Sequence, residues 1–142
     1  MRRIRLGKPF GILYIDLDRF KSVNDEYGHL VGDRVLREVA EVLKDAACPA
    51  AHVYRLGGDE FAMIVPEAEE TGMVLLKLRH VFDITKRIRI GSITVGASAG
   101  SARFPEDGRT TSELIGAADR RMYADKTRRK DEQSYSLTGG IC

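Results

Sequence analysis

Apolar positions along the chain switch between strand-like runs and helix-like spacing. Residues 11–16 form a nearly continuous apolar run that ends in an aspartate, which predicts a buried strand. Residues 52–54 and 61–65 are short apolar runs on either side of a Gly-Gly turn, so they predict a β-hairpin. Between these strands, residues 32–46 repeat apolar side chains on one helical face, and Pro49 marks the end of the predicted helix.

The second half of the chain predicts two helices and two strands. The first helix is expected over residues 69–81, where Met73, Leu76 and His80 recur at helical spacing. Two strands are expected at 86–90 and 93–102, with a turn at 91–92 between them. A last helix is expected over residues 112–127, and Thr110 or Thr111 could cap it.

The order of these elements is strand, helix, hairpin, helix, strands, helix. This order indicates the α+β class, with a mostly antiparallel central sheet similar to the split βαβ arrangement. Gly28 and Gly32 are expected to bracket a loop between the first strand and the first long helix. A length of 142 residues is typical of a single domain.

Composition excludes some classes of partner and location. The net charge of +2 comes from 23 basic and 21 acidic residues, a balance that does not indicate a nucleic-acid partner. No apolar run approaches the roughly 20 residues that a membrane-spanning helix needs, so no membrane partner is expected for this chain. Cys48 and Cys142 lack the spacing of a metal site or a disulfide framework. We therefore expect a cytoplasmic location.

Acidic residues cluster at two of the predicted strand ends. Asp59 and Glu60 directly follow the two glycines of the hairpin turn, where folding alone does not require a pair of carboxylates. Asp16 ends the first strand, and if that strand lies beside the hairpin, three carboxylates meet in one cleft. Such carboxylates repel one another unless cations neutralise them, and an oxygen-only site favours magnesium, often together with substrate phosphates. The alternative interpretation is a solvated acidic hairpin tip.

These motifs identify the chain as a member of the GGDEF family of diguanylate cyclases. The resemblance spans residues 11–130, with the motifs in the family's order but without the helix that usually precedes them. Residues 1–10 are then a lead-in and residues 131–142 a flexible tail. The segments that carry the resemblance are Arg55-Leu56-Gly57-Gly58-Asp59-Glu60-Phe61, Asp16-Leu17-Asp18-Arg19-Phe20-Lys21, residues 24–33, residues 104–108 and residues 118–126.

The resemblance implies a fold and a reaction. The fold would be the palm-type nucleotide cyclase fold, whose ferredoxin-like core is a mostly antiparallel sheet flanked by helices. The reaction would join two GTP molecules into cyclic di-GMP and release two pyrophosphates. Two Mg²⁺ or Mn²⁺ ions would bind in each active site, and a second copy of the domain would present the other GTP. A sensory domain, attached or separate, would be a further partner.

The resemblance also assigns roles to individual residues. Asp16, the backbone carbonyl of Leu17, Asp59 and Glu60 match metal ligands, and Asp59 also matches the base that activates the 3′-hydroxyl. Lys21 matches a lysine that stabilises charge in the transition state.

Further residues match the contacts to the nucleotide. Asn24 and Asp33 match guanine readers, since a carboxylate can accept the two hydrogens that guanine presents and adenine lacks. Asp33 could instead cap a helix. The other substrate contacts are the backbone amides of Arg19 and Phe20, the bare backbone of Gly57 and Gly58, and Lys126 with Lys130 for the terminal phosphates; the two lysines could instead form a basic helix end.

Two other functions remain open at this stage. The chain could be a non-catalytic GTP-binding module that regulates a partner, which the absence of the upstream helix favours. It could also be a palm-type cyclase that makes a different nucleotide product, although Asp33 and the complete Gly-Gly-Asp-Glu-Phe motif favour GTP.

Overall fold

The protein folds around one five-stranded antiparallel sheet. The computed structural model describes residues 7–47, 49–80, 88–91 and 93–139. The strands lie in the order β2-β3-β1-β5-β4, and each neighbouring pair is antiparallel. The bounds are β1 (Phe10–Asp18), β2 (His52–Gly57), β3 (Glu60–Val65), β4 (Ile88–Ile90) and β5 (Ile93–Phe104).

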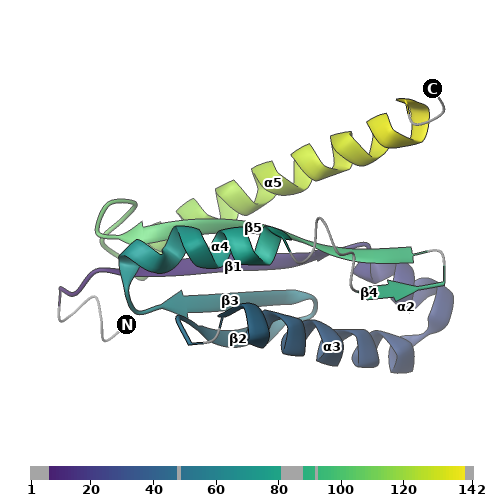
Figure 1. The fold of residues 1–142 in the computed structure, drawn as a ribbon, viewed down its shortest axis with the longest axis horizontal. Coiled ribbons are helices and arrows are strands. Elements are labelled where there is room, and N and C mark those ends of the chain that lie inside the picture. Colours follow the sequence, from purple (N-terminus) through teal and green to yellow (C-terminus); the bar gives the residue numbers. More distant parts are fainter. Residues whose placement is uncertain (1–6, 48, 81–87, 92, 140–142) are drawn as a thin grey trace.

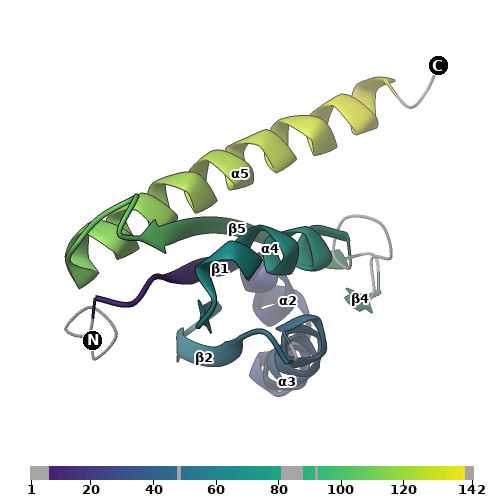
Figure 2. The ribbon, with the colours of Figure 1, turned by 60° about the vertical axis from the view of Figure 1, so that its left-hand side comes forward.

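Helices cover both faces of this sheet. Three helices lie on one face and the long α5 crosses the other, as Figures 1 and 2 show. The later turns of α5 extend away from the sheet in both views. The bounds are α2 (Phe20–Tyr27), α3 (His29–Ala47), η1 (Ala68–Glu70), α4 (Thr71–His80) and α5 (Thr111–Gly139).

The alternation of side chains along β1 builds a separate core on each face. Leu13, Ile15 and Leu17 point to the side of α2, α3 and α4, where they join the larger cluster. Phe10 and Ile12 point to α5 and join the smaller cluster. Each fully buried side chain of this size contributes roughly 1.5–3 kcal/mol to folding. Because β1 is buried on both faces, its sequence is apolar at almost every position.

The predicted fold class is confirmed. β1 and β2 are both antiparallel to β3, which lies between them, so they are parallel to each other and form a split βαβ unit. The hairpin is also confirmed, as β2 and β3. Thr110 is the residue that caps α5, because its hydroxyl accepts the backbone N–H of Glu113 at 3.1 Å.

The loop expected between Gly28 and Gly32 is not present. α3 begins at His29 and continues through Gly32, so the helix starts earlier than the apolar pattern predicts. Gly32 serves close packing instead of a turn, because a Cβ on Gly32 would overlap the side-chain oxygen of Asn24. α2 and α3 therefore approach each other closely at this point.

The second helix is present, but the helical spacing of Met73, Leu76 and His80 does not mark its buried face. Met73 is 57% exposed and Leu76 is 65% exposed, whereas Val74 and Leu78 are buried. The helix also begins with the 3-10 turn η1 and is regular α-helix only from Thr71. Its apolar residues, 73–76 and 78, are nearly consecutive, so spacing alone could not select the face that packs on β1 and β5.

Several other boundaries differ from the sequence prediction. β5 is longer than expected and ends at Phe104, and α5 continues to Gly139 instead of ending at residue 127. No proline interrupts this stretch, so the helix continues after its apolar pattern ends. Of the strand expected at 86–90, residues 88–90 form β4, while 86, 87 and the turn residue 92 lie outside the described residues. The flexibility expected for residues 131–142 stays a prediction.

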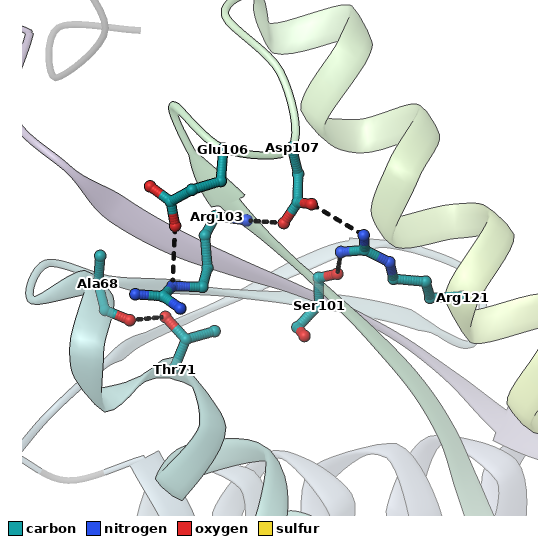
Figure 3. Close-up of polar contacts among 7 residues, drawn as sticks. All are labelled: Ala68, Thr71, Ser101, Arg103, Glu106, Asp107 and Arg121. Atoms are coloured by element: carbon teal, nitrogen blue, oxygen red, sulfur yellow. Dashed lines mark hydrogen bonds and ion pairs between the residues drawn. The ribbon is translucent and has the colours of Figure 1, made fainter.

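A polar network fastens the end of β5 to α5. Arg121 donates to Asp107 at 2.8 Å and to the carbonyl of Ser101 at 2.7 Å (Figure 3). Asp107 also accepts the backbone N–H of Arg103, whose guanidinium pairs with Glu106 at 3.3 Å. This network lies at the Phe104 end of β5, whereas the acidic motifs lie at the other end of the sheet. No helix in the described part of the chain is both long and apolar enough to cross a membrane.

Candidate active site

The turn between β2 and β3 depends on its two glycines. Gly57 has φ 132° and Gly58 has φ 54°, a region that side chains with a Cβ rarely adopt. A bulge separates Arg55 from Gly57 in the pairing with β3, and the Arg55 guanidinium donates to the Gly58 carbonyl at 2.9 Å. The turn is thereby held in one geometry, with Asp59 and Glu60 at its far side.

The sheet register brings the acidic motifs together. Asp16 of β1 pairs with Glu60 of β3, and the Leu17 N–H donates to the Asp59 carbonyl at 3.1 Å. The expected adjacency of the first strand and the hairpin is therefore correct. Asp16, Leu17, Asp59 and Glu60, the four residues predicted as metal ligands, lie at one end of two neighbouring strands.

Each of these carboxylates has a distinct electrostatic environment. Burial, and then the negative charge of Asp16, raise the pKa of Asp59 above its ordinary value. Glu60 accepts a hydrogen bond from the Tyr14 hydroxyl at 2.6 Å, and that bond to an acceptor carboxylate is the main reason that the pKa of Tyr14 rises to about 12. Asp16 instead pairs with Lys126, whose Nζ lies 2.6 Å from Oδ2.

The three carboxylates of Asp16, Asp59 and Glu60 lie at one end of the sheet, but their side chains are not grouped around a single point as a metal site would need. Among the residues that the structure describes, no three histidine, cysteine, aspartate or glutamate side chains are grouped to hold a metal ion. Like charges repel, and Tyr14 and Lys126 hold Glu60 and Asp16 separately. One atom fits a cation nevertheless: Asp16 Oδ1 is buried and has no hydrogen-bond partner. Carboxylate oxygens on adjacent strands suit a hard cation such as Mg²⁺ or Mn²⁺.

Lys126 reaches this site from α5. Burial alone would lower the pKa of its ammonium, but the hydrogen bond to Asp16 and the charges of Asp16, Asp18 and Asp59 outweigh burial and raise it. Lys130 is expected to join Lys126 in the phosphate contact. It lies about one helical turn later on α5.

The predicted phosphate-binding segment lies between β1 and α2. Arg19 has φ 67° and ψ 15°, a left-handed conformation that is uncommon for a residue with a side chain. This conformation turns the chain sharply from the sheet into α2, whose first backbone N–H groups have no partners within the helix. Phe20 is buried in the core and fixes the turn, while Lys21 is exposed. Backbone amides and one free lysine are therefore available at this corner.

The two predicted guanine readers lie on neighbouring helices. Asn24 of α2 is half-buried against Gly32 of α3, and Asp33 follows Gly32 with an exposed side chain. Because α3 begins at His29, Asp33 is beyond the first turn and does not cap the helix. The Asp33 carboxylate is therefore exposed on α3 and does not serve as the helix cap.

Several polar groups near the site were not predicted from the sequence. Ser98 donates to the buried Asp18 at 2.7 Å, and Asp125 accepts the backbone N–H of Ala99 at 2.9 Å. Tyr14 could have been found, because it lies two residues before Asp16 in the strand and thus shares its face. Asp125 could not have been found from the sequence, because its partners in the sheet are distant along the chain.

Comparison with known proteins places the chain in a family. The family model "Diguanylate cyclase, GGDEF domain" matches residues 1–132, and the chain belongs to this family. The chain is 39% identical over 125 residues to the bifunctional diguanylate cyclase/cyclic di-GMP phosphodiesterase MucR of Pseudomonas aeruginosa, and 36% identical over 129 residues to the diguanylate cyclase DosC of Escherichia coli. Each match covers 87% of this chain but 18% and 28% of those proteins, so the chain spans less than a third of their length.

A solved structure supports the same assignment. The chain resembles the crystal structure of an EAL/GGDEF domain protein from M. capsulatus with a TM-score of 0.73 and 38% sequence identity. The match covers 87% of this chain and 82% of that one. The α+β fold described above is therefore the GGDEF fold, and the palm-type prediction is confirmed.

Proposed function

We propose that this chain is a metal-dependent diguanylate cyclase domain that condenses two GTP molecules into cyclic di-GMP and two pyrophosphates. The observation that carries the proposal is the register of β1 and β3, which sets Asp16 beside Asp59 and Glu60 with Lys126 in contact. Phosphoryl transfer needs mainly positioning and charge neutralisation, and this end of the sheet supplies both kinds of group.

The acidic residues would hold the metal. Asp16, the carbonyl of Leu17, Asp59 and Glu60 would bind Mg²⁺ or Mn²⁺, two ions per site. The bound ions would lower the charge of the triphosphate and favour ionisation of the attacking hydroxyl. Asp59 also acts as the base that takes the proton of the 3′-hydroxyl, a role that its raised pKa supports.

The remaining groups would bind the nucleotide. Asn24 and Asp33 read guanine, and Asp33 is free for this because α3 does not use it as a cap. Lys21, Lys126 and Lys130 neutralise phosphates, together with the backbone amides of Arg19 and Phe20. Gly57 and Gly58 let the substrate approach the turn without a side chain in its path: no atom lies within 4 Å of a Cβ built at either position.

The reaction requires a second copy of the domain, since each copy presents one GTP to the other. A sensory domain, attached or separate, would control how the two copies meet. The length of the relatives supports an attached one, because the chain matches only a part of each. We place the reaction in the cytoplasm and expect no nucleic-acid or membrane partner for this chain.

The test is product formation from GTP and Mg²⁺ by the chain fused to a strongly dimerising coiled coil, analysed by chromatography. Cyclic di-GMP from the fusion, and none from the same fusion with Asp59→Asn, is the expected result. A folded fusion that binds GTP without turnover would support a non-catalytic GTP-binding module instead. A different nucleotide product would support the second alternative, a cyclase of other specificity.

A further inference from the structure

Lys126 and a metal ion would use the same carboxylate. Lys126 Nζ lies 2.6 Å from Asp16 Oδ2, although the two residues are 110 positions apart in the sequence. The Asp16 side chain is only 16% exposed, and its other oxygen, Oδ1, is buried without a hydrogen-bond partner. One oxygen of the carboxylate is thus held by an internal cation, and the other is left for an external one.

We propose that Lys126 is an internal counter-ion at Asp16, and that a divalent metal displaces it and so releases the ammonium towards the substrate phosphates. This inference rests on the proposed function, since it concerns the same metal site. It makes the metal and the phosphate-binding lysine successive occupants of one carboxylate, so that Lys126 becomes available for phosphate only after the metal has bound.

Charge explains why the exchange would occur in this direction. Without a cation, Asp16, Asp59 and Glu60 repel one another, and a lysine at 2.6 Å is the nearest compensation. A divalent ion neutralises two negative charges where Lys126 neutralises one, and its positive charge repels the ammonium. An ordinary lysine ammonium stays protonated at neutral pH, so Lys126 leaves the carboxylate as a cation suited to phosphate.

The surrounding structure confines the movement to one side chain. Asp125, the neighbour of Lys126, is buried and accepts the Ala99 N–H at 2.9 Å, which fixes this turn of α5 on the sheet. The Lys126 side chain itself is 41% exposed, so its ammonium can rotate away from Asp16 into solvent. The exchange therefore needs no displacement of the helix.

Metal binding measured without nucleotide tests the proposal directly. Free Mn²⁺ would be followed by electron paramagnetic resonance in titrations of the unmodified chain, Lys126→Met and Lys44→Met. Lys44 is a matched control, because it pairs with Glu41 on the exposed side of α3 at 3.9 Å. We expect Lys126→Met to bind Mn²⁺ at least about fivefold more tightly, because one competing positive charge is gone, and Lys44→Met to bind like the unmodified chain. Equal or weaker binding by a folded Lys126→Met would overturn the proposal.

A second readout uses the unmodified protein and so does not depend on how a variant folds. Reductive methylation of Lys126, quantified by mass spectrometry relative to Lys44, should become severalfold faster when Mg²⁺ is added, since the ion pair opens. An unchanged ratio at saturating Mg²⁺ would contradict the exchange.

Mn²⁺ binding by Asp16→Asn and Asp59→Asn distinguishes failure of the proposed exchange from failure of the proposed function. If both variants bind Mn²⁺ as tightly as the unmodified chain, there is no metal site at these acids. If they lose binding but Lys126→Met gains nothing, the metal site stands and only the exchange is wrong.

Discussion

Asp125, near the middle of α5, accepts a hydrogen bond at 2.9 Å from the backbone N–H of Ala99 in β5. A buried carboxylate thereby joins the long helix to the sheet directly beside Lys126. Arg128 lies 2.7 Å and Arg79 3.8 Å from the other carboxylate oxygen, so two cations balance the buried charge. The position of Lys126 at the acidic site depends on this junction.

Replacing Asp125 should therefore destabilise the domain. Asp125→Ala leaves the Ala99 N–H without an acceptor and two arginines without their counter-charge, and we expect a loss of about 2–4 kcal/mol in the free energy of unfolding. Asp125→Asn keeps an acceptor and should lose less. Urea denaturation measures both, with the exposed Asp119→Ala on the same helix as the control. A loss for Asp125→Ala no larger than that of the control would show that the junction is not structural.

Gly32→Ala should weaken nucleotide binding while leaving the domain folded. A Cβ at Gly32 would overlap the Asn24 side-chain oxygen, so the amide must move away from its present position against α3. We expect the affinity for a fluorescent GTP analogue to fall about tenfold, equivalent to one lost hydrogen bond of about 1.4 kcal/mol. Gly72→Ala is the matched control on α4, because no atom lies within 4 Å of its Cβ. Unchanged affinity in Gly32→Ala would remove Asn24 from the binding site.

Gly58→Ala should destabilise the turn that carries Asp59. The left-handed φ of 54° costs a residue with a Cβ about 1 kcal/mol, while asparagine tolerates this region better. In a domain of this size the midpoint of thermal unfolding should fall by about 3–5 °C for Gly58→Ala and by less for Gly58→Asn. Scanning calorimetry compares the two. Equal losses for both substitutions would show that the left-handed backbone conformation is not the cause.

The pair of Asp107 and Arg121 should make stability depend on pH in the acid range. The hydrogen bond from Arg121 lowers the pKa of Asp107 below its ordinary value of 3.8. A carboxyl with a lower pKa in the folded state stabilises the protein above pH 3.8, and this contribution disappears as the pH falls through the folded-state pKa. Asp107→Asn should therefore lose about 1 kcal/mol at pH 7 and progressively less below pH 3.8.

Urea titrations at pH 7, 4 and 3 would measure this difference. Glu106→Gln is the control, because its ion pair with Arg103 is about half exposed at both ends and should contribute under about 0.5 kcal/mol. A loss for Asp107→Asn that stays constant across this pH range would mean that the hydrogen bond acts independently of the carboxyl's charge.

Local patterns in the sequence determined the elements and the acidic motifs. Continuous apolar residues marked β1, the Gly-Gly pair marked the β2–β3 turn, and one apolar face marked most of α3. These predictions succeeded because each depends on residues that are neighbours along the chain, whose spacing sets which side of an element they occupy. The adjacency of Asp16 to the hairpin was a condition that local spacing could not settle, and the pairing of β1 with β3 meets it.

The tertiary structure decided what those patterns left open. It selected Val74 and Leu78 as the buried face of α4 from a nearly consecutive run of apolar residues, and it extended α3 back to His29. It also paired Lys126 with Asp16 and Asp125 with Ala99, across more than a hundred and more than twenty positions of sequence. Such contacts depend on how the sheet and α5 pack together, and nothing in the local spacing of residues encodes which distant partner a buried charge will meet.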